Sequence, residues 1–205
     1  MKKTVYQNTV GTYNKLGKKY LEESKKVVPP RRLPFLKHFS QNDHILDVGC
    51  GGGRDAKFFI ENGLRVTGID SSRVMISLAK KEVPKGKFKC LDMLKMNFPA
   101  SAFDGIWAQT VLLHLKREDV PKALKKLYRI LKKGGILHLT VKQGKGEKYV
   151  SEKLSGWHKR FYTYFSKKEM EDMVQKQGFK IMYSGMASDP HKRPGVRFVC
   201  IWAKK

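Results

Sequence analysis

Acidic residues are scarce in this chain of 205 residues, and basic residues outnumber them more than twofold. The 18 Asp and Glu stand against 43 Lys and Arg, which gives a formal net charge of +25 at pH 7. A surplus of this size is typical of proteins that bind polyanions such as RNA, because clustered cations release counterions from phosphate groups. The basic pairs are spread along the whole chain rather than gathered in one arm, so a general bias towards lysine explains the charge about equally well.

Only three cysteines are present, and long apolar runs are missing. Cys50, Cys90 and Cys200 are odd in number and far apart, in apolar, strand-like surroundings, which gives neither a disulfide framework nor zinc-ligand spacing. No segment approaches the roughly 20 apolar residues of a membrane span, and the first residues lack the apolar core of a signal peptide. We therefore expect a soluble, cytoplasmic protein in a reducing compartment, without a metal site or a membrane partner.

Short apolar runs alternate with helical patterns along a chain whose length suits one domain, residues 1–205. Strands are expected at 44–49, 65–70, 87–92, 103–108 and 135–141, with the continuous apolar character of a parallel sheet covered on both faces. Helices are expected at 53–62, 72–82 and 119–131, and another follows the capping box at 166–169. The runs 179–185 and 196–203 have no helix between them and predict an antiparallel hairpin. The pattern predicts an α/β fold with a doubly wound, mostly parallel, seven-stranded Rossmann-like sheet.

The stretch "ILDVGCGGGRDAKFF", residues 45–59, joins the first expected strand to the first expected helix through a glycine-rich turn. Glycine permits positive φ and lets a ligand approach the backbone, and the helix that follows offers free N–H groups. In open parallel sheets, ligands bind at the carboxyl ends of the strands, where this turn lies. The turn is therefore the expected ligand cradle.

Three acids at successive strand ends indicate which ligand the turn holds. Asp70 ends the second strand, 21 residues after Gly49, where a carboxylate can accept from both hydroxyls of a ribose. Asp92 ends the third strand, where it can accept from an adenine amino group while the Met93 N–H donates to the ring. Asp47 would repel a pyrophosphate but attract an ammonium group. Ribose, adenine and a cationic amino-acid end together describe S-adenosylmethionine.

Four stretches resemble the successive motifs of the class I S-adenosylmethionine-dependent methyltransferases, in order over about residues 45–143. They are "ILDVGCGGGRDAKFF", "VTGIDSSRVMISLAK", "CLDMLKMNFPASAFDGIWAQTVLLHL" and "KALKKLYRILKKGGILHLTVKQG". The tail "RFYTYFSKKEMEDMVQKQGF" is similar to the closing helix of small bacterial and archaeal members. The resemblance implies an N-terminal helical lid (1–38), a cofactor-binding core (39–143) and an acceptor-side segment with the C-terminal hairpin (144–205).

The resemblance also implies roles for particular residues. The glycine turn would hold the methionine moiety, and Gln109 would form part of the surroundings of its amino group. Arg54 would meet the methionine carboxylate, while a surface arginine on a helix is an equal alternative. The segment "TYNKLGKKY" resembles the family's aromatic lid helix, although core packing of its tyrosines is an equal alternative. Gly17 replaces a more usual alanine-like residue there and is expected to loosen the helix. The expected cofactor-binding residues are Asp47, Gly49, Cys50, Gly51, Gly53, Arg54, Asp70, Ser71, Asp92, Met93, Gln109 and Tyr20.

Methyl transfer from a sulfonium needs little beyond a well-placed nucleophile, so no catalytic dyad is required. His114 follows the fourth strand and could take a proton from the acceptor, with Tyr13 as a second catalytic candidate; a structural histidine is the more frequent alternative. The expected acceptor-binding residues are Lys142, Arg160, Tyr162 and Tyr164. For the last three, this expectation requires that the loop carrying them folds over the site.

Three functions remain open at this point. The first is methylation of a nitrogen or oxygen of a small molecule by a monomeric enzyme, because the chain is almost entirely core fold. The second is RNA methylation, favoured by the charge but without a recognisable RNA-binding module. The third is a protein that binds the cofactor or RNA without turnover, because fold does not fix function.

The assignment of Asp70 to the ribose is directly testable. Replacing Asp70 with Ala should abolish binding of S-adenosylmethionine while the fold stays intact, because the hydroxyls lose their common acceptor. Calorimetric titration measures the affinity, and circular dichroism checks the fold. Unchanged affinity would show that the ribose binds elsewhere.

Overall fold

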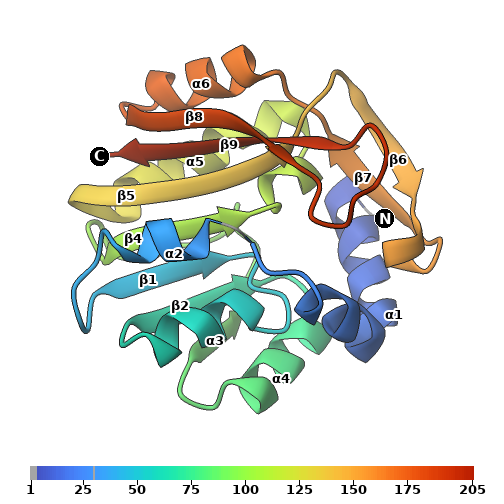
Figure 1. Cartoon of the computed structure of the whole chain (residues 1–205), viewed down its shortest axis with the longest axis horizontal. Helices are drawn as coiled ribbons and strands as arrows, with labels where there is room; N and C mark the ends of the chain where they lie inside the picture. Colours follow the sequence, from blue (N-terminus) through green and yellow to red (C-terminus); the bar gives the residue numbers. More distant parts are fainter. Residues whose placement is uncertain (1–3, 30) are drawn as a thin grey trace.

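A seven-stranded sheet organises the computed structural model, which describes residues 4–29 and 31–205 (Figure 1). Its strand order is β3-β2-β1-β4-β5-β9-β8. The strands are β1 (His44–Val48), β2 (Arg65–Asp70), β3 (Lys87–Cys90), β4 (Phe103–Gln109), β5 (Leu131–Lys142), β8 (Lys180–Ser188) and β9 (Arg197–Lys204). The first five run parallel, and β9 and β8 complete the sheet antiparallel. The doubly wound Rossmann-like prediction is confirmed, and the connection reverses direction between β1 and β4.

Helices cover both faces of this sheet, so its two sides bury separate apolar clusters (Figure 1). On one face, α2 (Arg32–Leu36), α3 (Arg54–Glu61) and α4 (Arg73–Glu82) pack around Phe35, Phe59 and Trp107. On the other, α5 (Val120–Ile130) and α6 (Lys167–Lys176) contribute Leu124, Met170 and other buried side chains. Burial on both sides explains why the central strands read as continuous apolar runs.

Local signals in the sequence set most helix ends. The Ser72 hydroxyl accepts from the N–H of Met75, and the expected capping box joins Ser166 to Glu169. Beyond the ends of α3 and α6, Gly63 and Gly178 have φ values of +85° and +96°. These caps place the helices within one or two residues of their expected ranges.

Two strand boundaries differ from the expectation. β5 begins at Leu131 rather than at residue 135, because Leu131 pairs with Phe103 of β4 before a register shift that leads on to the pair of Gly105 and Ile136. β3 ends at Cys90 rather than at residue 92, and this cysteine is exposed, contrary to the apolar setting expected for it. Both differences arise from tertiary pairing.

A second, two-stranded sheet was not expected from the sequence. It pairs β6 (Glu147–Ser151) with β7 (Lys159–Thr163) antiparallel, connected through the short 3-10 helix η3 (Lys153–Ser155). The prediction of a loop over "KRFYTYF" is therefore wrong for residues 159–163. Four of the five β7 residues are buried, since the strand is enclosed on both faces.

Helix α1 (Val5–Lys25) lies against this second sheet (Figure 1). The Thr12 hydroxyl donates to the Lys159 carbonyl at 2.8 Å, and the Thr9 hydroxyl accepts from the Phe161 N–H at 2.9 Å. Gly17 has φ +46° and ψ −124°, so the expected loosening takes the form of a kink. The expected lid range 1–38 also includes residues 1–3 and 30, which lie outside the described residues. Within the described residues, no helix is long and apolar enough to cross a membrane.

Candidate active site

The glycine turn is hydrogen-bonded to the carboxyl end of β2. The N–H groups of Gly49 and Cys50 donate to the Ile69 carbonyl at 2.8 and 3.0 Å. The Asp70 carboxylate accepts from the N–H of Gly51 at 3.0 Å and of Ser72 at 2.8 Å. A Cβ on Gly51 would meet nothing within 4 Å, although its φ of +52° favours glycine, so open space lies against the backbone there.

Two cavities adjoin this turn and share three of their lining residues: Tyr13, Gly49 and His114. The larger cavity extends from the turn to β5, β7 and the β8–β9 loop. The smaller one lies between α1 and the ends of β2 and β3, where Tyr6, Asp70 and Met93 line it. Tyr13 and His114 therefore lie where the two cavities meet.

Most residues predicted from the sequence line one of these cavities. The larger cavity is lined by Asp47, Cys50, Gly51, Arg54, Gln109, Tyr20, Lys142, Arg160 and Tyr162, and the smaller one by Asp70, Ser71 and Met93. Gly53, Asp92 and Tyr164 line neither cavity. Gly53 caps α3, Asp92 accepts from the Leu94 N–H, and the Tyr164 ring packs beside Lys148.

Asp47 is the clearest sign of a cationic ligand group. Its carboxylate is 3% exposed, and the Oδ2 atom has no hydrogen-bond partner. Burial, and then the nearby Asp55 carboxylate, raise the pKa of Asp47 well above its usual value. A ligand ammonium group at Oδ2 would stabilise the ionised form and satisfy the orphaned oxygen, so the residues present fit the amino-acid end of the cofactor.

Arg54 joins the cavity wall to the end of α1. Its guanidinium donates to both oxygens of Asp55, at 3.0 and 2.8 Å, and to the carbonyls of Ser24 and Val27 at 3.1 and 3.2 Å. These four bonds leave one of its five N–H groups for a ligand carboxylate. Arg54 thus has a structural role that the sequence did not predict, beside the predicted one.

Gln109 is oriented by a chain of buried side chains. The Trp202 indole N–H donates to Nδ1 of His138 at 2.8 Å, so neutral His138 carries its proton on Nε2. That N–H donates to Oε1 of Gln109 at 2.8 Å. The amide group that Gln109 has left for a ligand is consequently a donor, which suits a carboxylate better than the ammonium group expected from the sequence.

Tyr13 and His114 form a polar pair whose protons can be assigned. His114 is buried, and its Nδ1 lies 2.8 Å from the Phe161 carbonyl, which can only accept. The unprotonated Nε2 therefore accepts from the Tyr13 hydroxyl at 3.0 Å, and the Tyr13 oxygen accepts from Arg160 at 3.0 Å. Burial, with the charge of Arg160, lowers the pKa of His114 to about 3. Burial likewise raises the pKa of Tyr13, so both groups are neutral at pH 7.

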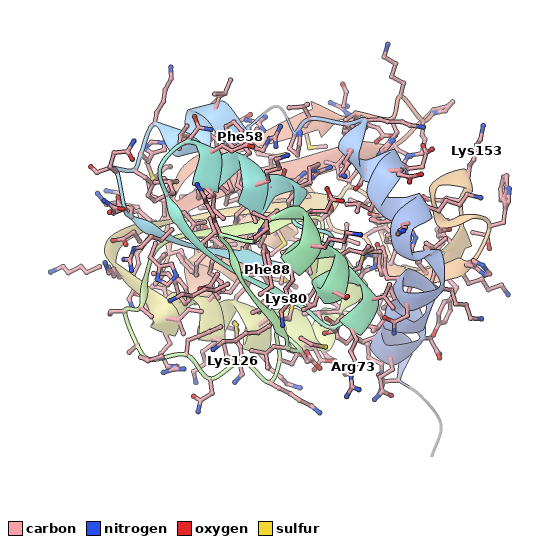
Figure 2. The ribbon with its side chains drawn as sticks, turned by 90° about the horizontal axis from the view of Figure 1, so that it is seen from below. Phe58, Arg73, Lys80, Phe88, Lys126 and Lys153 are labelled. Atoms are coloured by element: carbon pink, nitrogen blue, oxygen red, sulfur yellow. The ribbon has the colours of Figure 1, made fainter. Side chains whose placement is uncertain are left out.

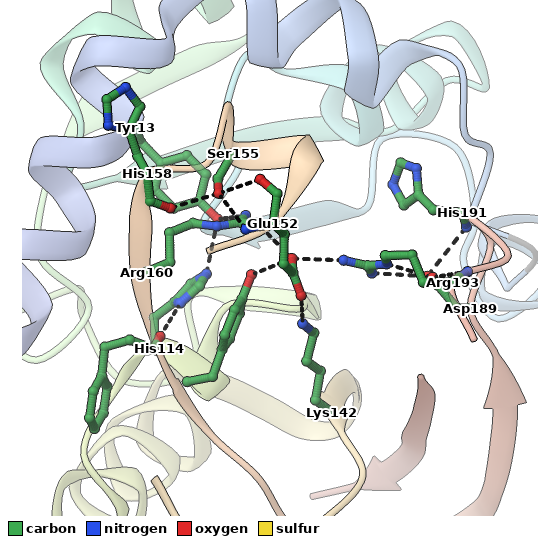
Figure 3. A network of polar contacts seen from close by, with 12 residues as sticks. Tyr13, His114, Lys142, Glu152, Ser155, His158, Arg160, Asp189, His191 and Arg193 are labelled. Atoms are coloured by element: carbon green, nitrogen blue, oxygen red, sulfur yellow. Dashed lines mark hydrogen bonds and ion pairs between the residues drawn. The ribbon is translucent and has the colours of Figure 1, made fainter. Parts of the chain in front are cut away.

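Three cations from separate segments meet at the opposite wall of the larger cavity (Figure 3). Lys142 ends β5, Arg160 lies on β7, and Arg193 belongs to the β8–β9 loop. All three pair with the Glu152 carboxylate, at 2.5, 2.7 and 2.8 Å respectively. Arg193 also forms a bidentate pair with Asp189. The predicted residues Lys142 and Arg160 are thus brought together.

The sequence analysis missed Glu152, Asp189 and Arg193. The last two lie in "ASDPHKRPG", where an acid and a base four residues apart, each followed by a proline, give a weak signal of a structured loop. Glu152 lies in "SEKLSG", which carries no catalytic pattern, and only the packing of β6 and β7 brings it to the site.

Fold and site together define a doubly wound α/β protein with two adjoining cavities at the carboxyl ends of its central strands. The family described as "Methyltransferase domain" matches residues 46–139. This match covers just under half of the chain and agrees with the resemblance to the class I S-adenosylmethionine-dependent methyltransferases, a family whose cofactor is S-adenosylmethionine.

The curated relatives that match this chain are also named as methyltransferases. The phosphoethanolamine N-methyltransferase of Plasmodium falciparum is 28% identical over 181 residues, which are 82% of this chain and 63% of the relative. The demethylmenaquinone methyltransferase of Symbiobacterium thermophilum is 33% identical over 51% of this chain and 45% of the relative. The chain thus spans less than two thirds of the length of these curated relatives.

Two solved structures show the same fold at low identity. A methyltransferase from Methanosarcina mazei has a TM-score of 0.75 at 22% identity and covers 87% of this chain and 98% of its own. The 1,6-didemethyltoxoflavin-N1-methyltransferase of Burkholderia thailandensis has a TM-score of 0.76 at 21% identity, over 98% and 86% respectively.

The neutral state of His114 predicts a pH-dependent loss of stability. Below pH 6.5 the unfolded chain binds a proton that folded His114 accepts only near pH 3, so stability falls by about 1.4 kcal/mol per pH unit. The variant His114→Gln lacks the titrating imidazole and therefore this pH-dependent loss of stability. Its deficit in melting temperature relative to wild type should therefore shrink between pH 7 and pH 5.

Thermal unfolding at both pH values measures this difference. Buried His138 is common to both proteins and cancels, while His158→Gln, a change at an exposed histidine, is the matched control. A deficit for His114→Gln that stays constant with pH would contradict the assignment.

Proposed function

We propose that this chain transfers the methyl group of S-adenosylmethionine to a nitrogen or oxygen of a small acceptor that carries an anionic group. The observation that carries this proposal is the pair of cavities that meet at Tyr13 and His114, one suited to a nucleoside and the other walled by cations. The reaction is an in-line displacement in which the chain contributes mainly position and orientation.

The smaller cavity suits the adenosine. Each Asp70 oxygen accepts one backbone N–H and keeps a lone pair for a ribose hydroxyl. Met93 and Tyr6 supply apolar surface for the base. The methionine end would lie along Gly51, with its ammonium group at Asp47 and its carboxylate near Arg54. When bound, the cofactor supplies a methyl group on a sulfonium, which is a good leaving group.

Tyr13 is the group best placed to orient the acceptor. Its hydroxyl lies where the cavities join, and His114 and Arg160 fix the direction of its hydrogen bonds. With a pKa of about 3, His114 is a weak proton acceptor at pH 7, so its main contribution is to hold Tyr13. This division of roles agrees with a reaction driven by positioning.

The cationic wall favours an acceptor with a phosphate or carboxylate. Charged hydrogen bonds from Arg160 and Arg193 match the geometry of such groups, and Lys142 adds a point charge. The two curated relatives are named for small-molecule substrates, phosphoethanolamine and demethylmenaquinone. An amine that carries a phosphate is therefore the first acceptor to test.

A matched pair of acceptors tests this proposal. Phosphoethanolamine and ethanolamine differ only in the phosphate, and formation of S-adenosylhomocysteine reports transfer to either. We expect transfer to phosphoethanolamine with a KM at least tenfold lower than that for ethanolamine, since one lost charged hydrogen bond alone costs about 1.5–3 kcal/mol. Arg193→Gln should raise the first KM and leave the second unchanged. Equal KM values would contradict an anionic acceptor, and no product with any acceptor would favour cofactor binding without turnover.

RNA is the second candidate acceptor, supported by the net charge of +25. Figure 2 shows Arg73 and Lys80 on α4, Lys126 on α5 and Lys153 at a distance from them, so basic side chains project from several separated elements. If RNA is the acceptor, the protein should shift tRNA in a gel at low salt and lose it steeply as salt rises. No shift at low salt would remove this candidate.

A further inference from the structure

Glu152 is the meeting point of the cation cluster, and the proposed reaction has no role for it yet. Its carboxylate pairs with three cations, whereas Asp55 at the other end of the cavity pairs with two. The Tyr162 hydroxyl adds a hydrogen bond at 3.3 Å. Figure 3 shows the cationic side chains converging on Glu152 from β5, β7 and the β8–β9 loop.

The three cations line the larger cavity, but Glu152 does not. The side chains of Lys142 and Arg160 are 5% and 3% exposed, so both charges need a nearby partner. Lys142 donates one of its three N–H groups to Glu152, and the Nε–H group of Arg160 has no hydrogen-bond partner. The carboxylate thus takes part of the cations' hydrogen-bonding capacity, and the remainder is available to a ligand.

The charges in this part of the site nearly balance. Lys142, Arg160 and Arg193 carry three positive charges, and Glu152 and Asp189 carry two negative ones. Although burial alone would raise it, the pKa of Glu152 is held below its usual value by Lys142 first and then by the two arginines. Glu152 is therefore ionised at neutral pH.

We propose that Glu152 is a specificity-determining residue, a built-in counterion that weakens the binding of free small anions to Lys142, Arg160 and Arg193. This inference rests on the proposed function, because the competing anion that matters is the acceptor's own phosphate or carboxylate. A free anion must compete with Glu152 for the same cations. An acceptor gains additional contacts near Tyr13 and so tolerates this competition.

The alternative is that Glu152 merely holds the three segments together. The two roles predict opposite signs for the loss of its charge. A counterion repels the ligand anion, so removal of its charge strengthens anion binding. Two unit charges about 6 Å apart at an effective dielectric of about 20 interact strongly enough to change the anion affinity on the order of tenfold or more. A purely structural role predicts weaker binding or none, because the cations would separate.

The test is a titration with inorganic phosphate at constant ionic strength, which is set with chloride. Thermal shift and calorimetry measure the phosphate affinity. We expect Glu152→Gln to bind phosphate about tenfold more tightly than wild type, and Glu152→Asp, which keeps the charge, to resemble wild type. Glu82→Gln is the matched control: it removes the same charge from an exposed pair with Lys25 on the outer surface. Equal or weaker phosphate binding by Glu152→Gln than by wild type would overturn the proposal.

A second variant keeps the test decisive if Glu152→Gln does not fold. Arg193 is the most exposed of the three cations, at 24%, and Arg193→Gln should lower phosphate affinity about tenfold, since one charged hydrogen bond is lost. Unchanged affinity would show that phosphate does not bind to this cluster, and the proposal would fail. Acetate titrated alongside distinguishes a phosphate site from a general carboxylate site.

The titration also separates this inference from the proposed function. It is carried out without cofactor or turnover, and S-adenosylhomocysteine affinity is measured on the same samples. If the variants shift phosphate binding but no protein binds S-adenosylhomocysteine, the proposed function fails, and Glu152 remains a counterion that weakens anion binding without a link to a methyl acceptor. If S-adenosylhomocysteine binds and Glu152→Gln leaves phosphate binding unchanged, the role of Glu152 fails alone.

Discussion

The hydrogen bonds from the N–H groups of Gly51 and Ser72 to the Asp70 carboxylate are the constraint on which the site depends. They join the turn after β1 to the turn after β2, so the backbone that faces the ligand has a fixed position. Burial raises the pKa of Asp70, while these two bonds oppose that effect. A carboxylate held in this way can receive hydroxyl groups without reorganising. Both cavities open from the backbone that it fixes.

A second constraint acts at the other end of the larger cavity, where the chain buries opposite charges. A buried cation needs an anionic partner, and the Glu152 carboxylate forms ion pairs with three cations. The segments that carry them are far apart in sequence, and the pairing of β6 with β7 brings Glu152 next to Arg160. The turns after β1 and β2 thus form the half of the site that we propose for the cofactor, while the half proposed for the acceptor depends on β5, β7 and the β8–β9 loop.

The sequence predicts the first half better than the second for a physical reason. Strand ends, glycine turns and helix caps are local patterns, so Asp70 and Gly51 could be assigned from their spacing. Arg160 and Lys142 could be named as candidates, but their common partner could not, because Glu152 lies in a segment without a distinctive pattern. The second sheet escaped prediction because "KRFYT" is stabilised by α1 and β6 rather than by its own periodicity. The tautomer of His138, and with it the donor role of Gln109, depends on Trp202, 64 residues away.

In the proposed binding mode, S-adenosylmethionine spans both cavities past Tyr13 and His114. A crystal structure with S-adenosylhomocysteine tests it most directly. We expect the ribose on Asp70, the adenine beside Met93, and the amino-acid end along Gly51 towards Asp47 and Arg54, with the cationic wall left open to the acceptor. Adenosine bound in the larger cavity against Lys142 and Arg193 would contradict it, because the cluster assigned to the acceptor would then belong to the cofactor.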